Sequence, residues 1–129
     1  MTRREARVQA MQIIFTNGFY NSSLIESLGY HDCEEKEQVL EFIKLIDGKE
    51  AQIDTIISAC LENYTIDRLN QVDKAIIRLA TAELLSGTPK GVVINEALEI
   101  TREYSDQGDN KAVRFNNKLL DKIVKKLEL

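Results

Sequence analysis

The sequence has few of the residues from which active sites are usually built. Its 129 residues include one histidine, two cysteines, one proline and no tryptophan. Cys33, Cys60 and His31 are too few to supply a set of metal ligands. The sequence also lacks a glycine-rich phosphate loop and a serine or cysteine with a candidate histidine base. We therefore expect neither an enzyme nor a metal or cofactor site.

Long apolar runs and a secretory signal are also missing. No stretch approaches the roughly 20 apolar residues that a membrane-spanning helix needs. The first residues lack the apolar segment and small-residue cleavage site of an exported protein. Cys60 occupies an apolar helix position and is expected to be a buried thiol in a reduced compartment, whereas His31 is expected in an exposed loop. The length and a hydrophobic content of 43% predict one globular domain over 1–129 in the cytoplasm.

Charge is distributed unevenly along a chain whose formal net charge is −4. The segment 26–62 holds ten acidic residues and three lysines. In contrast, 111–126 holds six basic residues and one acid, and the first seven residues hold three arginines and one acid. An acidic middle with basic ends indicates a surface for nucleic acid or another polyanion.

Helical periodicity recurs through the whole sequence, and no alternating strand pattern is found. Gly48 is expected to interrupt and bend one long helix. Thr88 is expected to be the N-cap of a later helix that starts at Pro89. The pattern predicts an all-α bundle of six or seven helices. The expected helices cover residues 3–17, 22–29, 35–63, 70–86, 89–105 and 110–127.

Three arginines stand in the first turns of the first expected helix, where the helix dipole disfavours positive charge. Arg3, Arg4 and Arg7 share a side with the apolar residues, so the tip of this helix is expected to project beyond the edge of the core. Guanidinium groups there, beside free backbone N–H groups, suit a phosphate ligand. The alternative is that these arginines pair with the acidic middle segment of the same chain.

A second basic stripe follows one outer face of the last expected helix. Arg114, Lys118, Lys122 and Lys125 recur at three- or four-residue spacing, although lysine-rich solvated faces are common. Asn116 falls within the apolar arc of this helix. A buried asparagine needs hydrogen-bond partners, so we expect it to face a cleft or a subunit contact.

Two acids of the helix expected at 70–86 need an explanation. Glu83 lies within its apolar arc and must be paired if buried. We expect its partner to be an arginine, such as Arg68, or the free N–H groups at the start of a neighbouring helix. Asp73, on the first turn, is expected to be exposed, either as an acid favoured by the helix dipole or as a contact for a basic protein partner.

Several elements together resemble the NusB family of bacterial transcription antitermination factors. The motifs are "DKAIIRLATAELL", "P-x-x-VVINEALEI" and "F-x-N-x-x-LDKI", with the family's spacing. In addition, "TRREARVQAMQ" resembles the family's arginine-rich amino-terminal motif. The resemblance covers nearly the whole chain and is weakest from about 18 to 50.

The resemblance implies an all-α fold of two packed helical subdomains. It implies binding to the boxA segment of nascent RNA together with NusE, a small-subunit ribosomal protein. As part of an RNA polymerase antitermination complex, the protein would support processive transcription of ribosomal RNA operons. The matching positions place Arg3, Arg4 and Arg7 in the RNA-binding motif and Phe115 near the RNA. Asp73 matches an acid that meets NusE.

The sequence departs from the family pattern near the last helix. Asn116 replaces an apolar residue, Lys118 replaces a glycine, and Lys111 stands near a position that is often acidic. Tyr64 takes the role of an aromatic that many members carry before Arg68. These changes add polarity or positive charge near the expected RNA surface. The candidate RNA-binding residues are Arg3, Arg4, Arg7, Lys111, Arg114, Phe115 and Lys118.

Two other function classes fit the sequence. The protein could be mainly a protein–protein or self-association module, in which a homodimer covers the arginine tips and RNA contact is secondary. It could also be the helical accessory domain of an RNA-modifying enzyme, since related domains precede methyltransferase domains. The chain ends at Leu129 without a catalytic domain, which disfavours this last reading.

Overall fold

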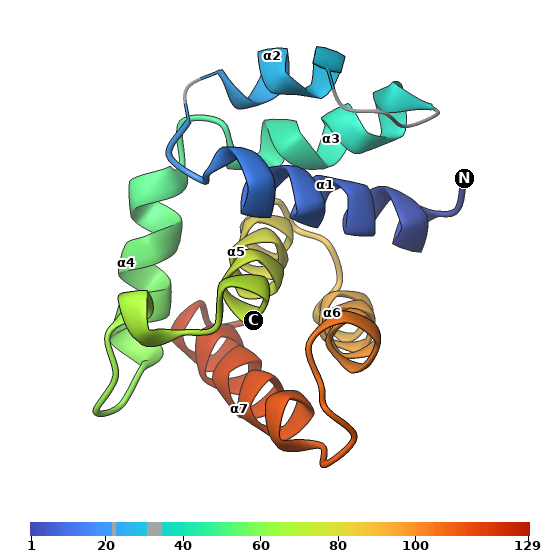
Figure 1. The fold of residues 1–129 in the computed structure, drawn as a ribbon. Coiled ribbons are helices and arrows are strands. Elements are labelled where there is room, and N and C mark those ends of the chain that lie inside the picture. The colour runs from blue at the N-terminus through green and yellow to red at the C-terminus, as the bar shows by residue number, and fades with distance from the viewer. Residues whose placement is uncertain (22, 31–34) are drawn as a thin grey trace.

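The computed structural model describes residues 1–21, 23–30 and 35–129. These residues form α-helices and short 3₁₀ turns, without a strand, which confirms the predicted all-α fold class (Figure 1). The helices are α1 (Arg3–Asn17), α2 (Leu24–Ser27), α3 (Lys36–Ile46), α4 (Glu50–Cys60), α5 (Gln71–Leu85), α6 (Lys90–Tyr104) and α7 (Lys111–Lys126). The 3₁₀ turns are η1 (Leu28–Tyr30) and η2 (Ile66–Arg68). Within the described ranges, every helix is too short or too polar to cross a bilayer.

Helix α5 forms the centre of the bundle. It packs against α1, α3, α4, α6 and α7. Figure 1 shows α1, α2 and α3 grouped on one side of α5, with α4, α6 and α7 around its other sides. A helix that is apolar on most sides is buried on most sides, and nearly all of α5 from Asp73 to Leu84 is buried.

The ends of α1 follow from local sequence. Thr2 Oγ1 accepts a hydrogen bond of 3.0 Å from the Glu5 backbone N–H, and the Glu5 carboxylate accepts one of 3.2 Å from the Thr2 N–H. This capping box fixes the start of the helix. Gly18, with φ +92°, ends it after Asn17, because a glycine adopts a positive φ without steric cost. The predicted range 3–17 is confirmed.

Two helix predictions were wrong. The single helix expected over 35–63 is two helices, since α3 ends at Ile46 and Gly48 takes a left-handed φ of +78° before α4 begins at Glu50. Gly48 therefore breaks the helix instead of bending it. Pro89, not Thr88, occupies the N-cap position of α6, which starts at Lys90. His31 and Cys33, with the loop expected there, lie outside the described residues.

An ion pair and a tyrosine join α4 and α5 to the turn after α1. Arg78 donates to both carboxylate oxygens of Asp54, at 2.9 and 2.7 Å, and Tyr20 Oη donates to Asp54 at 2.7 Å. The Arg78 guanidinium also lies 4.3 Å from the centre of the Phe19 ring. Burial, and next the hydrogen bond to Asp54, raise the pKa of Tyr20 from 10.0 to about 12.

This shift predicts a pH dependence of stability. The folded protein favours the protonated phenol, so the contribution is complete below pH 10 and is lost as pH rises from 10 toward about 12. Because Tyr20 is well exposed, we expect a loss of less than about 1 kcal/mol. Urea unfolding of wild type and Tyr20→Phe at about pH 8 and about pH 11 measures it. The difference between the two proteins should shrink at the higher pH, and an unchanged difference would contradict the prediction.

Candidate nucleic-acid interface

Arg7 does not reach solvent. Its exposed fraction is 6%, and Nη2 lies 2.8 Å from Oε1 of Glu83, while Nε donates to both Glu83 oxygens at 3.1 Å. Nη1 lies 3.5 Å from Glu96 Oε1. The expectation of a free guanidinium at this position was wrong, because α1 packs on α5 and brings Arg7 onto the buried carboxylate. Glu83 is paired with an arginine, as expected, but this arginine is Arg7 and not the suggested Arg68.

Arg3 and Arg4 are paired but remain about half exposed. Arg3 Nη1 lies 2.8 Å from Glu41 and Arg4 Nη2 lies 2.6 Å from Glu96, with side-chain exposures of 52% and 45%. The hydrogen bond to Glu96, and next its charge, raise the pKa of Arg4 above its ordinary value. All three arginines thus follow the intramolecular alternative, although only Glu41 belongs to the acidic middle segment.

The basic side chains of α7 are placed differently. Lys111, Arg114 and Lys118 are exposed, and none forms an ion pair within the described part of the chain. Lys122 is half-buried and its Nζ lies 2.9 Å from Glu62 Oε1. Residues four apart on a helix share a face, so Arg114, Lys118 and Lys122 follow one side of α7.

Two aromatic rings stand beside this basic face. Tyr64, in the loop between α4 and η2, and Phe115 of α7 have ring centres 6.0 Å apart and ring planes inclined at 55°. They are 50% and 37% exposed. An exposed aromatic pair next to unpaired cations combines a stacking surface with phosphate-binding charge.

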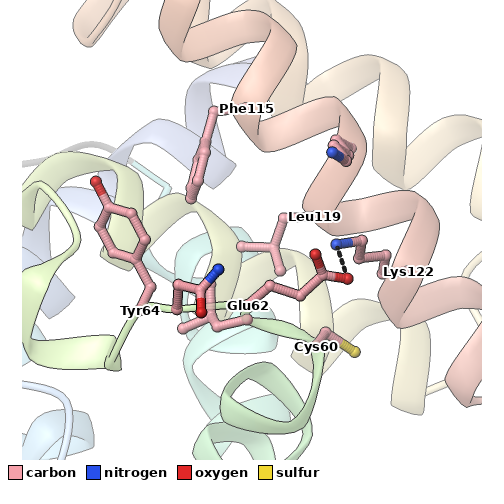
Figure 2. Close-up of a pocket in the computed structure, with 9 residues that line it drawn as sticks. Cys60, Glu62, Tyr64, Phe115, Leu119 and Lys122 are labelled. Carbon is pink, nitrogen blue, oxygen red and sulfur yellow. Dashed lines mark ion pairs between the residues drawn. The ribbon is translucent and has the colours of Figure 1, made fainter.

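The rings border a hollow of about 210 Å³, here called the Cys60 cavity. Figure 2 shows Phe115 and Leu119 projecting from α7 toward the loop that carries Glu62 and Tyr64, with Lys122 across the cavity from Tyr64. Burial raises the pKa of the Cys60 thiol, so the thiol stays protonated near neutral pH. The lining residues are Cys60, Leu61, Glu62, Asn63, Tyr64, Phe115, Lys118, Leu119 and Lys122.

A second hollow of about 260 Å³, the Asp73 cavity, borders the same two rings. Tyr64 and Phe115 line both hollows, so we call the two cavities together the α7 groove. The groove brings the side chains of the loop 61–70 next to the first half of α7. The lining of the Asp73 cavity consists of Tyr64, Arg68, Leu69, Asn70, Asp73, Lys111, Ala112 and Phe115.

Asp73 and Asn116 belong to a buried polar network between α5, α6 and α7. Asp73, only 8% exposed, accepts hydrogen bonds at Oδ1 from Ser105 Oγ at 2.5 Å and from Asn116 Nδ2 at 3.1 Å. Asn116 is fully buried and also donates to Thr101 Oγ1 at 3.0 Å. Both expectations were wrong: Asp73 is not exposed and Asn116 does not face a cleft, because the two side chains are buried together and the Asn116 amide N–H groups bond to Asp73 and Thr101.

The structure thus brings together only part of the predicted site. Lys111, Phe115 and Lys118 line the α7 groove, and Arg114 lies on the exposed face of the same helix outside both cavity linings. Arg3, Arg4 and Arg7 line neither cavity. Sequence reasoning missed Asn63 and did not assign Tyr64, Arg68 or Lys122 to the site, although Lys122 belongs to the recognised basic stripe. No cluster of three metal-ligating side chains occurs among the residues that the structure describes.

Comparison with known proteins decides the family. The model described as "NusB family" matches residues 4–125. The chain belongs to the NusB family. The transcription antitermination protein NusB of Clostridium botulinum is 39% identical over 98% of this chain and its own full length. The Staphylococcus aureus protein of the same name is 38% identical over 97% of this chain and likewise its full length.

A solved NusB structure agrees with this assignment, and a second solved structure shares the fold. T. maritima NusB superimposes with a TM-score of 0.78 at 32% identity, covering 100% of this chain and 99% of that chain. A chain from a crystal structure of a plectonemic RNA supercoil superimposes with a TM-score of 0.75 at 25% identity, covering 98% and 96%. The resemblance seen in the sequence is confirmed. The relatives are antitermination factors, so the prediction of a non-enzymatic protein is confirmed as well.

Proposed function

We propose that this NusB-family chain binds single-stranded boxA-type RNA through the α7 groove. One observation carries the proposal: cations that form no ion pair within the described part of the chain lie beside exposed aromatic rings on one surface. Lys111 and Lys118 in the groove, with Arg114 beside it, contact phosphates, and bases stack on Tyr64 and Phe115. A chain of this fold in a structure of an RNA supercoil is consistent with RNA contact.

The three arginines of α1 have different roles in this proposal. Arg3 and Arg4 are half exposed, and surface ion pairs are worth only about 0–1 kcal/mol. An RNA phosphate can therefore take the place of Glu41 at low cost, whereas Glu96 is only 14% exposed and holds Arg4 more firmly. Arg7 acts as a positioning residue, because its guanidinium is occupied by the buried Glu83 and holds α1 on α5.

The RNA-bound chain works with NusE in the RNA polymerase antitermination complex and supports processive transcription of ribosomal RNA operons. Asp73 is the proposed contact for NusE. Its Oδ1 accepts hydrogen bonds from Ser105 and Asn116, and Asp73 is a lining residue of the Asp73 cavity together with Arg68 and Lys111. A basic or hydrogen-bonding side chain of the partner can enter this cavity and meet the carboxylate there.

Salt dependence of binding tests the phosphate contacts. For single-stranded nucleic acid, log K falls with log salt by about 0.7 per phosphate neutralised. We expect the double variant Arg114→Gln with Lys118→Gln to flatten this slope by about 1.4 and to weaken binding of a boxA RNA. Fluorescence anisotropy between about 50 and about 200 mM salt, with and without NusE, measures the affinity and its salt slope.

The control removes two positive charges elsewhere. Lys44 lies exposed on α3 and Lys49 in the turn before α4, and neither lines the α7 groove. Lys44→Gln with Lys49→Gln changes the net charge equally and should leave the slope nearly unchanged. Equal losses in both double variants would mean that only the overall charge matters and would contradict binding at α7.

A further inference from the structure

The Cys60 cavity has the size and chemistry for a single ring system. Its volume of about 210 Å³ is below the roughly 300–1,000 Å³ of sites for drug-sized ligands. The Glu62–Lys122 ion pair, at 2.9 Å, bounds it on the side away from Tyr64. A planar group that enters the cavity therefore lies between the Glu62–Lys122 ion pair and the two aromatic rings. The cavity has no room for a second planar group.

The polar group best placed to recognise such an occupant is the amide of Asn63. Asn63 lines the cavity in a left-handed conformation with φ +59°, which asparagine tolerates better than most residues. Within residues 35–129 its side-chain amide has no hydrogen-bond partner. An amide offers a donor and an acceptor side by side, which matches the hydrogen-bonding edge of a nucleobase.

We propose that the Cys60 cavity holds one unpaired nucleobase of the bound RNA, with the Asn63 amide as its specificity-determining group. Phe115 and Tyr64 supply the stacking surface, and the unpaired Lys118 at the cavity wall meets the phosphate of the same nucleotide. This inference rests on the proposed RNA binding by α7. It adds a base-specific contact to a surface otherwise built from charge and stacking, which do not distinguish one base from another.

A positional scan of the RNA tests the proposal. One nucleotide at a time in a boxA RNA is made abasic, and binding to the full chain is measured by fluorescence anisotropy. At one position the abasic RNA should bind about 5–150-fold more weakly, the range expected for losing one stacked base. Replacing that base by each of the other three should also weaken binding to the wild-type chain.

Asn63→Gly removes the amide and keeps the backbone conformation, because glycine adopts a positive φ readily. In this variant the four bases at the sensitive position should bind within about twofold of one another, while an abasic site still weakens binding. The matched control is Asn110→Gly, since Asn110 is also left-handed, with φ +61°, but does not line the cavity. The control should keep the wild-type preference.

The outcomes separate the two proposals. RNA that binds with no position sensitive to base removal overturns the nucleobase site and leaves RNA binding by α7 standing. If Asn63→Gly keeps the full base preference, the role of Asn63 in the nucleobase site is overturned, since another group then recognises the base. RNA binding by α7 again stands. Absence of any RNA binding overturns the proposed function and this inference together, and favours a side chain of a protein partner as the occupant.

Discussion

Replacing Arg7 with methionine is expected to lower the free energy of unfolding by about 3–5 kcal/mol, because the substitution leaves the buried Glu83 carboxylate unpaired. The pair is buried on both sides, with side-chain exposures of 7% and 4%. For a domain of this size the loss corresponds to a fall in Tm on the order of 10–20 °C. Urea denaturation and thermal unfolding followed by circular dichroism measure both quantities.

The double variant Arg7→Met with Glu83→Leu separates a structural role from an RNA contact. Replacing both members of a buried ion pair by apolar residues of similar size is often neutral for stability. We therefore expect the double variant to regain most of the stability and to bind boxA RNA as the wild type does. Recovered stability with a large loss of RNA affinity would mean that Arg7 leaves Glu83 and contacts the RNA, contrary to its assignment as a positioning residue.

The helices could be predicted well because their signals are local. The capping box Thr2–Glu5 marks the start of α1, and the apolar stripe of α7 lies within one stretch of chain. The bounds of α1, α5, α6 and α7 differ from the predicted ones by at most a residue at either end. The break at Gly48 was underestimated, since periodicity alone continues across one left-handed residue while the helix does not.

The pairings could not be predicted because they join distant segments. Glu83 required a partner on sequence grounds, but the partner lies 76 positions away and depends on how α1 packs against α5. The same limit applies to Asp73 and Asn116, which are 43 positions apart. A usable signal was present at Asn116, since an asparagine within an apolar arc needs a polar partner from another part of the chain.

Only one wall of the α7 groove could be predicted, because the other wall comes from a distant segment of the chain. The basic stripe of α7 and Phe115 could be recognised from spacing and from the family motif. The other wall comes from the loop 61–70, whose residues have no periodicity that would predict which way they face. Only the packing of α4 and α5 against α7 carries Asn63 and Tyr64 to that helix.

Phe115→Ala is expected to weaken binding of boxA RNA about 5–150-fold, the equivalent of the roughly 1–3 kcal/mol that a stacked base contributes. Its cost in folding stability should be moderate, because the ring is 37% exposed and its contact with Tyr64 contributes about 0.5–1.5 kcal/mol beyond the area that it buries. The control is Phe15→Ala, which removes an exposed aromatic side chain of α1 that lines neither cavity. This variant should leave RNA affinity unchanged.

The salt dependence of this variant distinguishes stacking from charge. Phe115 carries no charge, so Phe115→Ala should lower affinity by the same factor at every salt concentration and keep the wild-type slope of log K against log salt. Phe115→Trp, which preserves an aromatic face, should restore most of the affinity. A slope that falls as it does for Arg114→Gln with Lys118→Gln would show that the substitution displaces the cations of α7, and stacking on Phe115 would then be the wrong explanation.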